Sequence, residues 1–317
     1  MTTELVGAED AGQRLDRFCA ARHPELSRTR LAELIRDGKV LLEGRTARPS
    51  ERLEAGHRVT LELPGAAPRE VPLEAEDIPL SILFEDEAVL VLDKPADLVV
   101  HPGAGVSRGT LAAALLHHAP EVAGVGGANR SGLVHRLDRG TTGVMVVAKS
   151  DAAHRALQAQ FKGRLVEKIY HAIVWGRPRE EAGTIDRPVG RDPRSRVKMS
   201  TRAVRGREAR SDYATRGSVP GFAWLEVQIF TGRTHQVRVH LAALGHPVVG
   251  DLTYGGDRAP SLTDPVRRKV VRQVERPLLH AFRLGIDHPV SGARLVFEAP
   301  WPDDLVRAWV GLGGEAP

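Results

Sequence analysis

The order of the apolar segments beyond residue 80 is the feature that most constrains the fold of this chain. Seven segments are short, rich in β-branched and aromatic residues and typical of strands: residues 82–84, 89–92, 144–148, 169–175, 224–230, 279–286 and 295–298. Four segments have apolar residues at helical spacing: residues 111–118, 152–161, 234–244 and 305–310. Because strands outnumber helices and do not strictly alternate with them, the pattern predicts a mixed-sheet α+β domain and not a doubly wound one.

The first 63 residues have a pattern of their own. Apolar residues at helical spacing predict one helix over residues 13–21 and a second between Ser27, a suitable N-cap, and Gly38. Short strands are predicted at residues 39–42 and 58–63. Together they indicate a small helix-helix-strand module.

A linker follows this module. Residues 64–72, PGAAPREVP, are rich in residues that continue neither a helix nor a strand. We therefore expect a module at residues 1–63, a linker at 64–74 and a second domain at 75–317, which is ample length for two domains.

Positive charge is concentrated in one segment. The net charge is +5 and the pI is about 9.6, but arginine so outnumbers lysine that a coding bias accounts for part of this total. Residues 187–216 hold ten basic residues against three acidic ones, whereas residues 1–63 are balanced. The segment is either a solvated loop or a surface that steers RNA toward a nearby site with salt-dependent binding.

Several classes of protein lack support in the sequence. No apolar run approaches the roughly 18 residues of a membrane span, and residues 1–10 lack the layout of a signal peptide, so a cytoplasmic protein is expected. The single cysteine, Cys19, excludes an internal disulfide and predicts a packed thiol. His235 and His240 lack the spacing of a helical zinc pair, and residues 124–129 lack the third glycine of a dinucleotide loop.

Asp138 lies between two arginines in the turn-rich segment 133–143, LVHRLDRGTTG, which runs directly into the apolar residues 144–148. A buried carboxylate costs free energy unless it is paired and hydrogen-bonded. Asp138 is therefore either neutralised in a structural ion pair or held for chemistry. This segment alone leaves both interpretations open.

The segment resembles the catalytic motif of the pseudouridine synthases of the RluA/RluD family, which isomerise uridine within RNA. Gly140 and Thr142 stand where family members often carry an acidic residue and a serine, but Asp138 and its flanking arginine are unchanged. Three further segments of the chain are similar to family motifs: LFEDE to VVHPG at residues 83–103, EKIY at 167–170, and TGRTHQVRVH at 231–240 with the pieces behind it at 250–255 and 279–281. The resemblance implies the mixed, largely antiparallel sheet of the pseudouridine synthase fold.

The resemblance also implies a chemistry. The reaction breaks the N1 to C1′ bond, rotates the base and joins C5 to C1′ without a net change in atoms or electrons. No metal, redox cofactor or nucleotide is therefore required. Asp138 is the implied anionic group, and it attacks the sugar, adds to the base or abstracts the 2′ proton, three alternatives that the sequence leaves open.

Three other residues take roles from the resemblance. Arg233 is the implied ion-pair partner of Asp138, with a surface arginine at a helix start as the alternative. Tyr170 is expected to stack on the uracil, with a core-packed strand aromatic as the alternative. Arg136 is expected to fill the stack vacated by the flipped uridine, whereas the neighbouring His135 is predicted to be a hydrogen-bonded core histidine.

The amino-terminal module is similar to the S4 RNA-binding domain, which often precedes the catalytic domain in this family. That similarity implies phosphate contacts from the basic residues of its helix pair and strands: Arg28, Arg30, Lys39 and Arg45. RNA is the expected partner of the whole chain, which is expected to be a monomer.

Two functions follow from these patterns. The first is a cofactor-free isomerase that flips a uridine out of structured RNA, most similar to the branch that acts on large-subunit (23S) ribosomal RNA, with transfer RNA as the alternative substrate. The second is a catalytically silent ribosome assembly factor that binds RNA through the module and residues 187–216. The motifs favour the isomerase, because a protein that only binds RNA does not need a carboxylate in an RNA-facing pocket.

Overall fold

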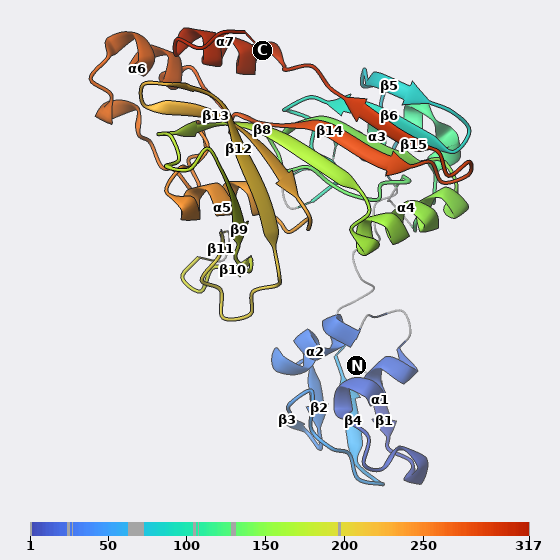
Figure 1. Cartoon of the computed structure of the whole chain (residues 1–317). Helices are drawn as coiled ribbons and strands as arrows, with labels where there is room; N and C mark the ends of the chain where they lie inside the picture. Colours follow the sequence, from blue (N-terminus) through green and yellow to red (C-terminus); the bar gives the residue numbers. More distant parts are fainter. Residues whose placement is uncertain are drawn as a thin grey trace. The chain divides into compact units, whose positions relative to one another are not determined.

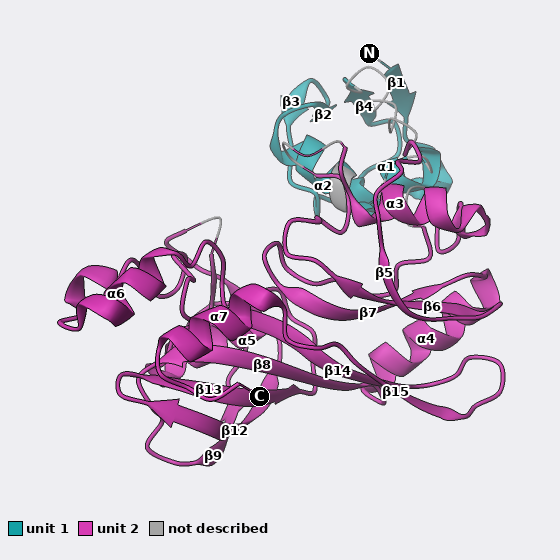
Figure 2. Ribbon diagram, turned by 90° about the horizontal axis from the view of Figure 1, so that it is seen from above, with its two compact units in different colours: residues 1–72 teal, residues 73–317 magenta. Residues whose placement is uncertain are grey.

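The computed structural model describes residues 2–23, 26, 28–62, 73–103, 106, 108–127, 131–195 and 198–316, with only the backbone described for Thr29 and Arg30. The chain divides into two compact units, Met1–Pro72 and Leu73–Pro317 (Figure 2). The predicted N-cap Ser27, the side chain of Arg30 and residues 64–72 of the predicted linker lie outside the described residues.

Unit 1 combines two helices with a four-stranded antiparallel sheet. Its helices are α1 (Leu15–Arg22) and α2 (Arg28–Arg36), preceded by the 3-10 turn η1 (Ala8–Asp10). Its strands, in sheet order, are β1 (Thr2–Leu5), β4 (Arg58–Leu61), β2 (Val40–Leu42) and β3 (Arg45–Thr46). Buried side chains of both helices and of β2 and β4 form one core, which includes Cys19. Strand β1 was not predicted because its mostly exposed residues form a sheet edge without hydrophobic alternation.

Unit 2 is built on a nine-stranded sheet (Figure 1). The strands, in sheet order, are β5 (Ser81–Glu85), β6 (Val89–Lys94), β7 (Thr142–Ala148), β14 (Leu279–Asp287), β8 (Glu167–Trp175), β13 (Phe222–Ile229), β12 (Arg210–Val219) and β9 (Ala182–Asp186). Strand β15 (Arg294–Glu298) pairs with β14. The pair β7–β14 is parallel, and the other pairs of this sheet are antiparallel. The predicted mixed, largely antiparallel sheet is confirmed.

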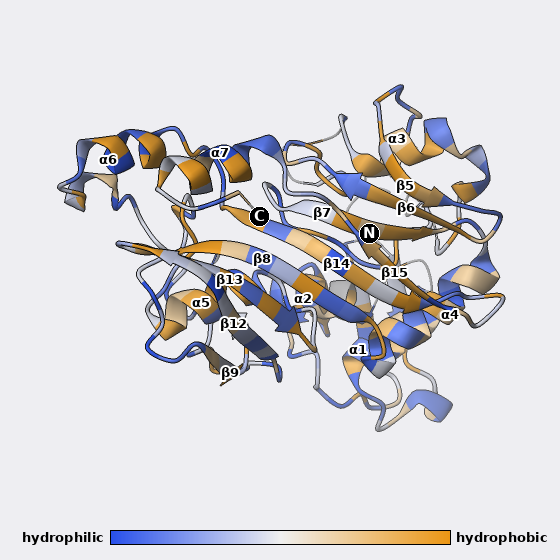
Figure 3. Cartoon of the chain, turned by 45° about the horizontal axis from the view of Figure 1, so that its top comes forward, coloured by the Kyte–Doolittle hydropathy of each residue, from blue (hydrophilic) through white to orange (hydrophobic). Residues whose placement is uncertain are grey.

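Helices cover both faces of β6 and β7. Helix α3 (Leu111–His118), followed by the 3-10 turn η2 (Pro120–Val122), packs in one cluster with Leu90, Leu92, Met145 and Val147. Helix α4 (Asp151–Gly163) packs in another with Val89, Val91, Val144 and Val146. Because successive side chains of a strand point to opposite faces, β7 is buried along its whole length. Figure 3 shows hydrophobic and hydrophilic segments side by side on α4, as expected for a helix with one solvent face.

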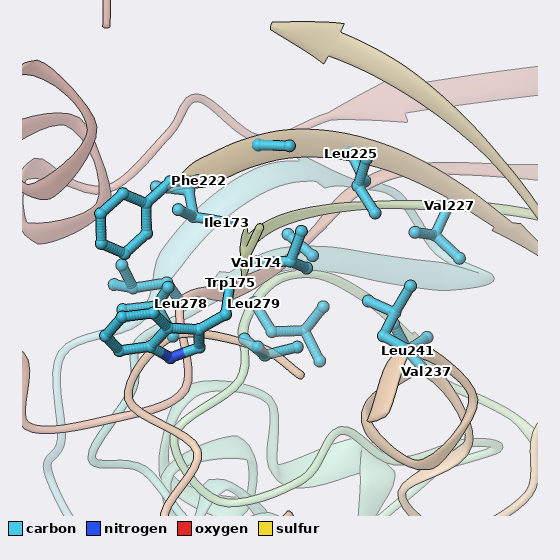
Figure 4. Packing of buried hydrophobic residues seen from close by; sticks show 14 of the residues in the cluster. Ile173, Val174, Trp175, Phe222, Leu225, Val227, Val237, Leu241, Leu278 and Leu279 are labelled. Carbon is cyan, nitrogen blue, oxygen red and sulfur yellow. The ribbon is translucent and has the colours of Figure 1, made fainter. Parts of the chain in front are cut away.

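A third cluster fixes the other half of the sheet. Helices α5 (Gln236–Leu244), α6 (Pro265–Arg272) and α7 (Asp303–Gly311) contribute side chains to it, and the 3-10 turn η3 (Ala259–Ser261) contributes Ala259. Val237 and Leu241 of α5 lie in this cluster with residues of β8 and β13 (Figure 4). The packing holds the start of α5 against the sheet, and this helix start carries much of the site described below.

The structure adds elements that were not predicted. The sequence did not predict strands β9 and β12 or helix α6. Strand β12 and helix α6 carry many charged residues, and α6 buries only Val271. The predicted basic surface segment 187–216 contains the two-stranded sheet of β10 (Gly190–Arg191) and β11 (Met199–Ser200), and its last residues belong to β12. Helix α5 starts at Gln236, two residues later than predicted. No helix in the described part of the chain is long and apolar enough to cross a membrane.

Candidate functional site

Asp138 lies in a tight turn that ends at the first residue of β7. The N–H of Thr141 donates to the carbonyl of Asp138 at 3.0 Å, and the N–H of Gly140 donates to the carbonyl of Ala96 at 3.1 Å. Gly140 has φ +81°, a conformation that favours glycine. Arg276 donates to the Gly140 carbonyl at 2.8 Å. The backbone around Asp138 is therefore held from two separate segments of unit 2.

The start of β7 is locked to β14 at a close approach of the two strands. A Cβ atom on Gly143, which has φ +112°, would lie 2.2 Å from the carbonyl oxygen of Ala281. One residue earlier, the Thr142 hydroxyl lies 2.8 Å from Nδ1 of the fully buried His280, whose Nε2 lies 3.1 Å from the Ala299 carbonyl. Burial lowers the pKa of His280 to about 4, so its ring is neutral. Nε2 must then donate to the carbonyl, and Nδ1 accepts from Thr142.

One pocket collects the residues of unit 2 that the sequence singled out. Arg136, Asp138, Tyr170 and Arg233 all line it, and its volume is about 90 Å³. Tyr170 reaches it from β8, where it pairs with Val227 on one side and Ala281 on the other. The pocket is small beside the roughly 300–1,000 Å³ of sites that enclose drug-sized ligands.

Asp138 shares an arginine with a second carboxylate. Nη1 of Arg238 donates to Oδ2 of Asp138 at 3.3 Å. Nε and Nη2 of the same guanidinium donate to the two oxygens of Asp251 at 2.6 and 2.9 Å. Asp251 also accepts from the N–H groups of Thr253 and Tyr254 at 3.0 and 3.2 Å. The guanidinium is thus oriented by a charge-assisted fork on one side and presents its remaining nitrogen to Asp138.

The predicted ion pair between Arg233 and Asp138 is wrong, because Arg238 is the arginine that pairs with Asp138 among the described residues. Arg233 precedes helix α5, and its Nε donates to the carbonyl of Glu208 at 3.1 Å. Both arginines lie in the motif TGRTHQVRVH, and only their place relative to the helix start separates them. A usable signal was present, since Arg238 stands between two valines in an apolar helical stretch, and a buried arginine requires a carboxylate partner.

His235 is a further neighbour of Asp138 whose role was not predicted. Its Nε2 lies 3.9 Å from Oδ2 of Asp138, and its Nδ1 lies 2.7 Å from the hydroxyl of Tyr254. Burial lowers the pKa of His235, which favours the neutral ring. The residue has φ +57° at the N-cap of α5, and its side chain makes no capping bond. Its side chain is therefore directed by Tyr254 and not by the helix end.

His135 and Arg136 have different surroundings although they are adjacent. Nε2 of His135 accepts from the N–H of Val146 at 3.0 Å, and the ring stacks on Phe161. Burial lowers the pKa of His135 to about 3, so the ring is neutral and hydrogen-bonded, as predicted. Arg136 is exposed at the pocket.

Three of the four basic residues predicted to bind phosphate in unit 1 are exposed but paired, and the side chain of the fourth, Arg30, lies outside the described residues. Arg28 contacts Asp16 at 3.0 Å, Lys39 contacts Glu62 at 2.9 Å and Arg45 contacts Glu51 at 2.8 Å. About half of each basic side chain is exposed. The Lys39 and Arg45 pairs are worth about 0–1 kcal/mol each, so a phosphate can replace their carboxylates at little cost, whereas the partner of Arg28 is the buried Asp16.

The described residues contain no group of three or more histidine, cysteine, aspartate or glutamate side chains arranged to hold a metal ion. The charged groups around Asp138 form an ion-pair network. Two carboxylates flank one guanidinium, and the carboxylate of Asp251 is already fully engaged by hydrogen bonds. This arrangement can hold and orient a single reactive carboxylate.

Comparison with known proteins gives consistent matches. Residues 88–243 match the family described as RNA pseudouridylate synthase, and residues 13–59 match the S4 domain. The chain is 44% identical to a Pseudomonas aeruginosa protein named ribosomal large subunit pseudouridine synthase D, over 95% of this chain and 92% of that protein. A protein of the same name from Xanthomonas campestris pv. campestris is 45% identical over 96% of this chain and 90% of its own length. The solved structure of human RNA Pseudouridylate Synthase Domain Containing 4 aligns with a TM-score of 0.58 and 29% identity, covering 73% of this chain and 92% of that chain.

Proposed function

The chain belongs to the RNA pseudouridylate synthase family, and from this premise we propose that it isomerises uridines in large-subunit ribosomal RNA. The relatives from Pseudomonas aeruginosa and Xanthomonas campestris carry that substrate in their names and align over nearly the whole chain. The observation that carries the proposal is the carboxylate of Asp138, which lines a pocket together with Tyr170 and is held by Arg238.

We propose that Asp138 supplies the anionic group of the reaction. Its Oδ2 is bound by Arg238, while its Oδ1 has no hydrogen-bond partner among the described residues. That second oxygen is available to the sugar or the base of a uridine in the pocket. The N1 to C1′ bond breaks, C5 bonds to C1′, the C5 proton leaves to solvent and N1 gains a proton, so the reaction balances without a further reactant.

Tyr170 and Arg136 are proposed to hold the extruded nucleotide. Burial raises the pKa of the Tyr170 phenol, which therefore remains a neutral hydroxyl on a flat apolar ring. Stacking of a base on an aromatic ring is worth about 1–3 kcal/mol, which offsets part of the cost of unstacking the uridine. Arg136 is exposed at the same pocket, where its planar guanidinium can take the place that the base leaves in the RNA.

Positively charged surfaces on both units are proposed to bind the RNA backbone. Arg233 lines the pocket and is bound to Glu208 through Nε, which leaves its terminal nitrogens for a phosphate. In unit 1 we propose residues 1–63 as the RNA-binding module, with contacts from Arg28, Arg30, Lys39 and Arg45. The double charge reversal Lys39→Glu with Arg45→Glu should weaken RNA binding and flatten its salt dependence. Unchanged binding would remove these residues from the interface.

The substrate is tested by mapping pseudouridine chemically in all RNA from cells that lack this protein. We expect one or more sites in large-subunit ribosomal RNA to lose the modification and to regain it with the wild-type gene but not with Asp138→Asn. Loss confined to transfer RNA would replace the proposed substrate. An unchanged map, together with a defect in ribosome assembly, would favour the silent RNA-binding alternative.

A further inference from the structure

We infer that Tyr254 is a positioning residue that connects the arginine-rich hairpin, the described residues 187–195 and 198–209 with β10 and β11, to the side chains that face Asp138. The inference rests on the proposed function, since it concerns how bound RNA organises the same site. Tyr254 is half-buried and is not among the residues that line the pocket. It therefore acts through its neighbours and not on the substrate.

The hydroxyl of Tyr254 joins the hairpin to His235. It accepts a hydrogen bond from the N–H of Met199 in β11 at 2.9 Å, and it lies 2.7 Å from Nδ1 of His235. Among the described residues Nδ1 is the acceptor within reach of the Tyr254 hydroxyl, so the single proton of the hydroxyl is donated to Nδ1 and the proton of the neutral imidazole lies on Nε2. Nε2 lies 3.9 Å from Oδ2 of Asp138. The tyrosine thus selects the tautomer that turns an N–H toward the carboxylate.

The ring and backbone of Tyr254 act on the other neighbour of Asp138. The guanidinium carbon of Arg238 lies 5.1 Å from the ring centroid, which is within the range of a cation–π contact. The backbone N–H of Tyr254 donates to Asp251, the carboxylate that grips Arg238. One residue therefore contacts both side chains that approach Asp138 and also the carboxylate behind them.

The hairpin is fastened to this cluster and not only to its own strands. Val189 and Arg207 exchange two backbone hydrogen bonds of 2.9 Å at its base. Met199 and Tyr254 pack together on a small apolar group formed by Val189, Ala209 and Val239. Val239 follows Arg238 directly in α5, so the hairpin and the helix start share one packing unit.

The positive charge of the hairpin indicates that the phosphates of RNA bind it. Exposed basic side chains follow its described turns, among them Arg194, Arg202 and Arg205. Phosphates that bind these side chains restrict the position of the segment that contains Met199, whose N–H donates to the hydroxyl of Tyr254. RNA docking on the hairpin therefore fixes the orientation of His235 and Arg238 through a contiguous set of contacts. Without the tyrosine hydroxyl, RNA binds equally well but the site is less well ordered.

The test uses the full-length protein and a large-subunit ribosomal RNA transcript labelled with tritium at C5 of uridine, because the reaction releases that hydrogen. Tyr254→Phe keeps the ring and removes the hydroxyl. We expect the single-turnover rate at saturating protein to fall about 10-fold, the factor for about 1.4 kcal/mol, with the Kd for RNA changed less than about 2-fold. Tyr213→Phe, which removes the hydroxyl of a buried tyrosine in β12 away from the pocket, is the matched control and should keep the wild-type rate.

A second variant tests the same connection from the side of the hairpin, and urea unfolding of both variants distinguishes a lost contact from a loss of stability. Met199→Pro removes the N–H that holds the tyrosine hydroxyl and leaves Tyr254 in place. We expect a decrease similar to that of Tyr254→Phe, and no further decrease when the two are combined, because they remove the same connection. Wild-type rates for Tyr254→Phe, or additive effects of the two changes, would overturn the inference. A wild-type protein that releases no tritium from this RNA would instead count against the proposed substrate.

Discussion

Asp138 and Asp251 contact the same guanidinium, yet their surroundings differ in every other respect. The side chain of Asp251 is 1% exposed and accepts four hydrogen bonds, two from Arg238 and two from backbone N–H groups. The side chain of Asp138 is 17% exposed and accepts one described hydrogen bond, at 3.3 Å. A carboxylate with a full set of partners is part of the framework. A carboxylate with a free oxygen beside a pocket is available for chemistry.

The difference follows from the cost of burying charge. An ionised carboxylate removed from water must recover its lost hydration through hydrogen bonds and an opposite charge. Asp251 does so completely, and this fixes Arg238. Asp138 accepts a hydrogen bond from one nitrogen of Arg238, the arginine that Asp251 orients. Substitutions at the two positions should therefore affect different properties of the protein.

The largest effect is expected for Asp138→Asn, because it removes the charge that we propose takes part in the reaction, and little else. Pseudouridine formation should fall by at least about 10³-fold, while RNA binding persists and the free energy of unfolding changes by only about 1 kcal/mol, because Arg238 keeps its pair with Asp251. Tritium release and urea unfolding measure the two quantities. Asp303→Asn, the same change at an exposed carboxylate of α7, is the control and should alter neither. Turnover within 10-fold of wild type would remove Asp138 from the mechanism.

Asp251→Asn should lower the free energy of unfolding much more than Asp138→Asn does. It breaks a buried pair and leaves the Arg238 guanidinium without its fork, which costs about 3–5 kcal/mol of the free energy of unfolding. Activity should fall as well, because Arg238 loses its orientation. Asp304→Asn removes the fork partner of Arg276, but that carboxylate is 41% exposed, so its loss should be smaller. Equal losses in urea unfolding would contradict the framework role of Asp251.

The two arginines of the TGRTHQVRVH motif sharpen the comparison further. Lysine cannot grip Asp251 and reach Asp138 at the same time, because it lacks the planar fork of arginine. Arg238→Lys should therefore lower the rate of pseudouridine formation about 100-fold, equivalent to about 2.7 kcal/mol. Arg233→Lys keeps a positive charge at the pocket wall and should cost less than about 5-fold. If Arg233→Lys proved the more damaging change, the geometric assignment of Arg238 would have to be abandoned.

Much of this architecture could be predicted because the relevant signals are local. The apolar runs of β6, β7 and β8 and the spacing in α3 and α4 identify these elements with nearly correct bounds. Strand β12 escaped prediction because charged residues interrupt its alternation, although Ser211 and Tyr213 are buried. Local pattern identifies an element when one face is clearly apolar, and it fails where a strand near the edge of a sheet is largely solvated.

The sequence predicted four residues that lie together, but not which arginine pairs with Asp138, and it missed the approach of His235. The motifs indicated Asp138, Tyr170, Arg136 and Arg233 for one site, and all four line one pocket. The choice between Arg233 and Arg238 depends on where α5 begins, and helix boundaries are the least certain part of any sequence pattern. The approach of Tyr254 to His235 joins residues 19 positions apart across a helix and a turn. A local sequence pattern cannot predict a contact between residues so far apart in the chain.

The smallest expected effect concerns two adjacent threonines, Thr141 and Thr142. As with the two aspartates, one side chain has more hydrogen-bond partners than the other among the described residues. Thr142 bonds to the neutral, buried His280, so Thr142→Val leaves Nδ1 of that ring without a donor and should cost about 1–3 kcal/mol. The hydroxyl of Thr141 is buried and has no hydrogen-bond partner among the described residues. Thr141→Val replaces it with a methyl group of similar size and should leave the free energy of unfolding unchanged or raise it. Urea unfolding of the two variants decides the matter, since a larger loss for Thr141→Val would mean that the pairing of these hydroxyls is reversed.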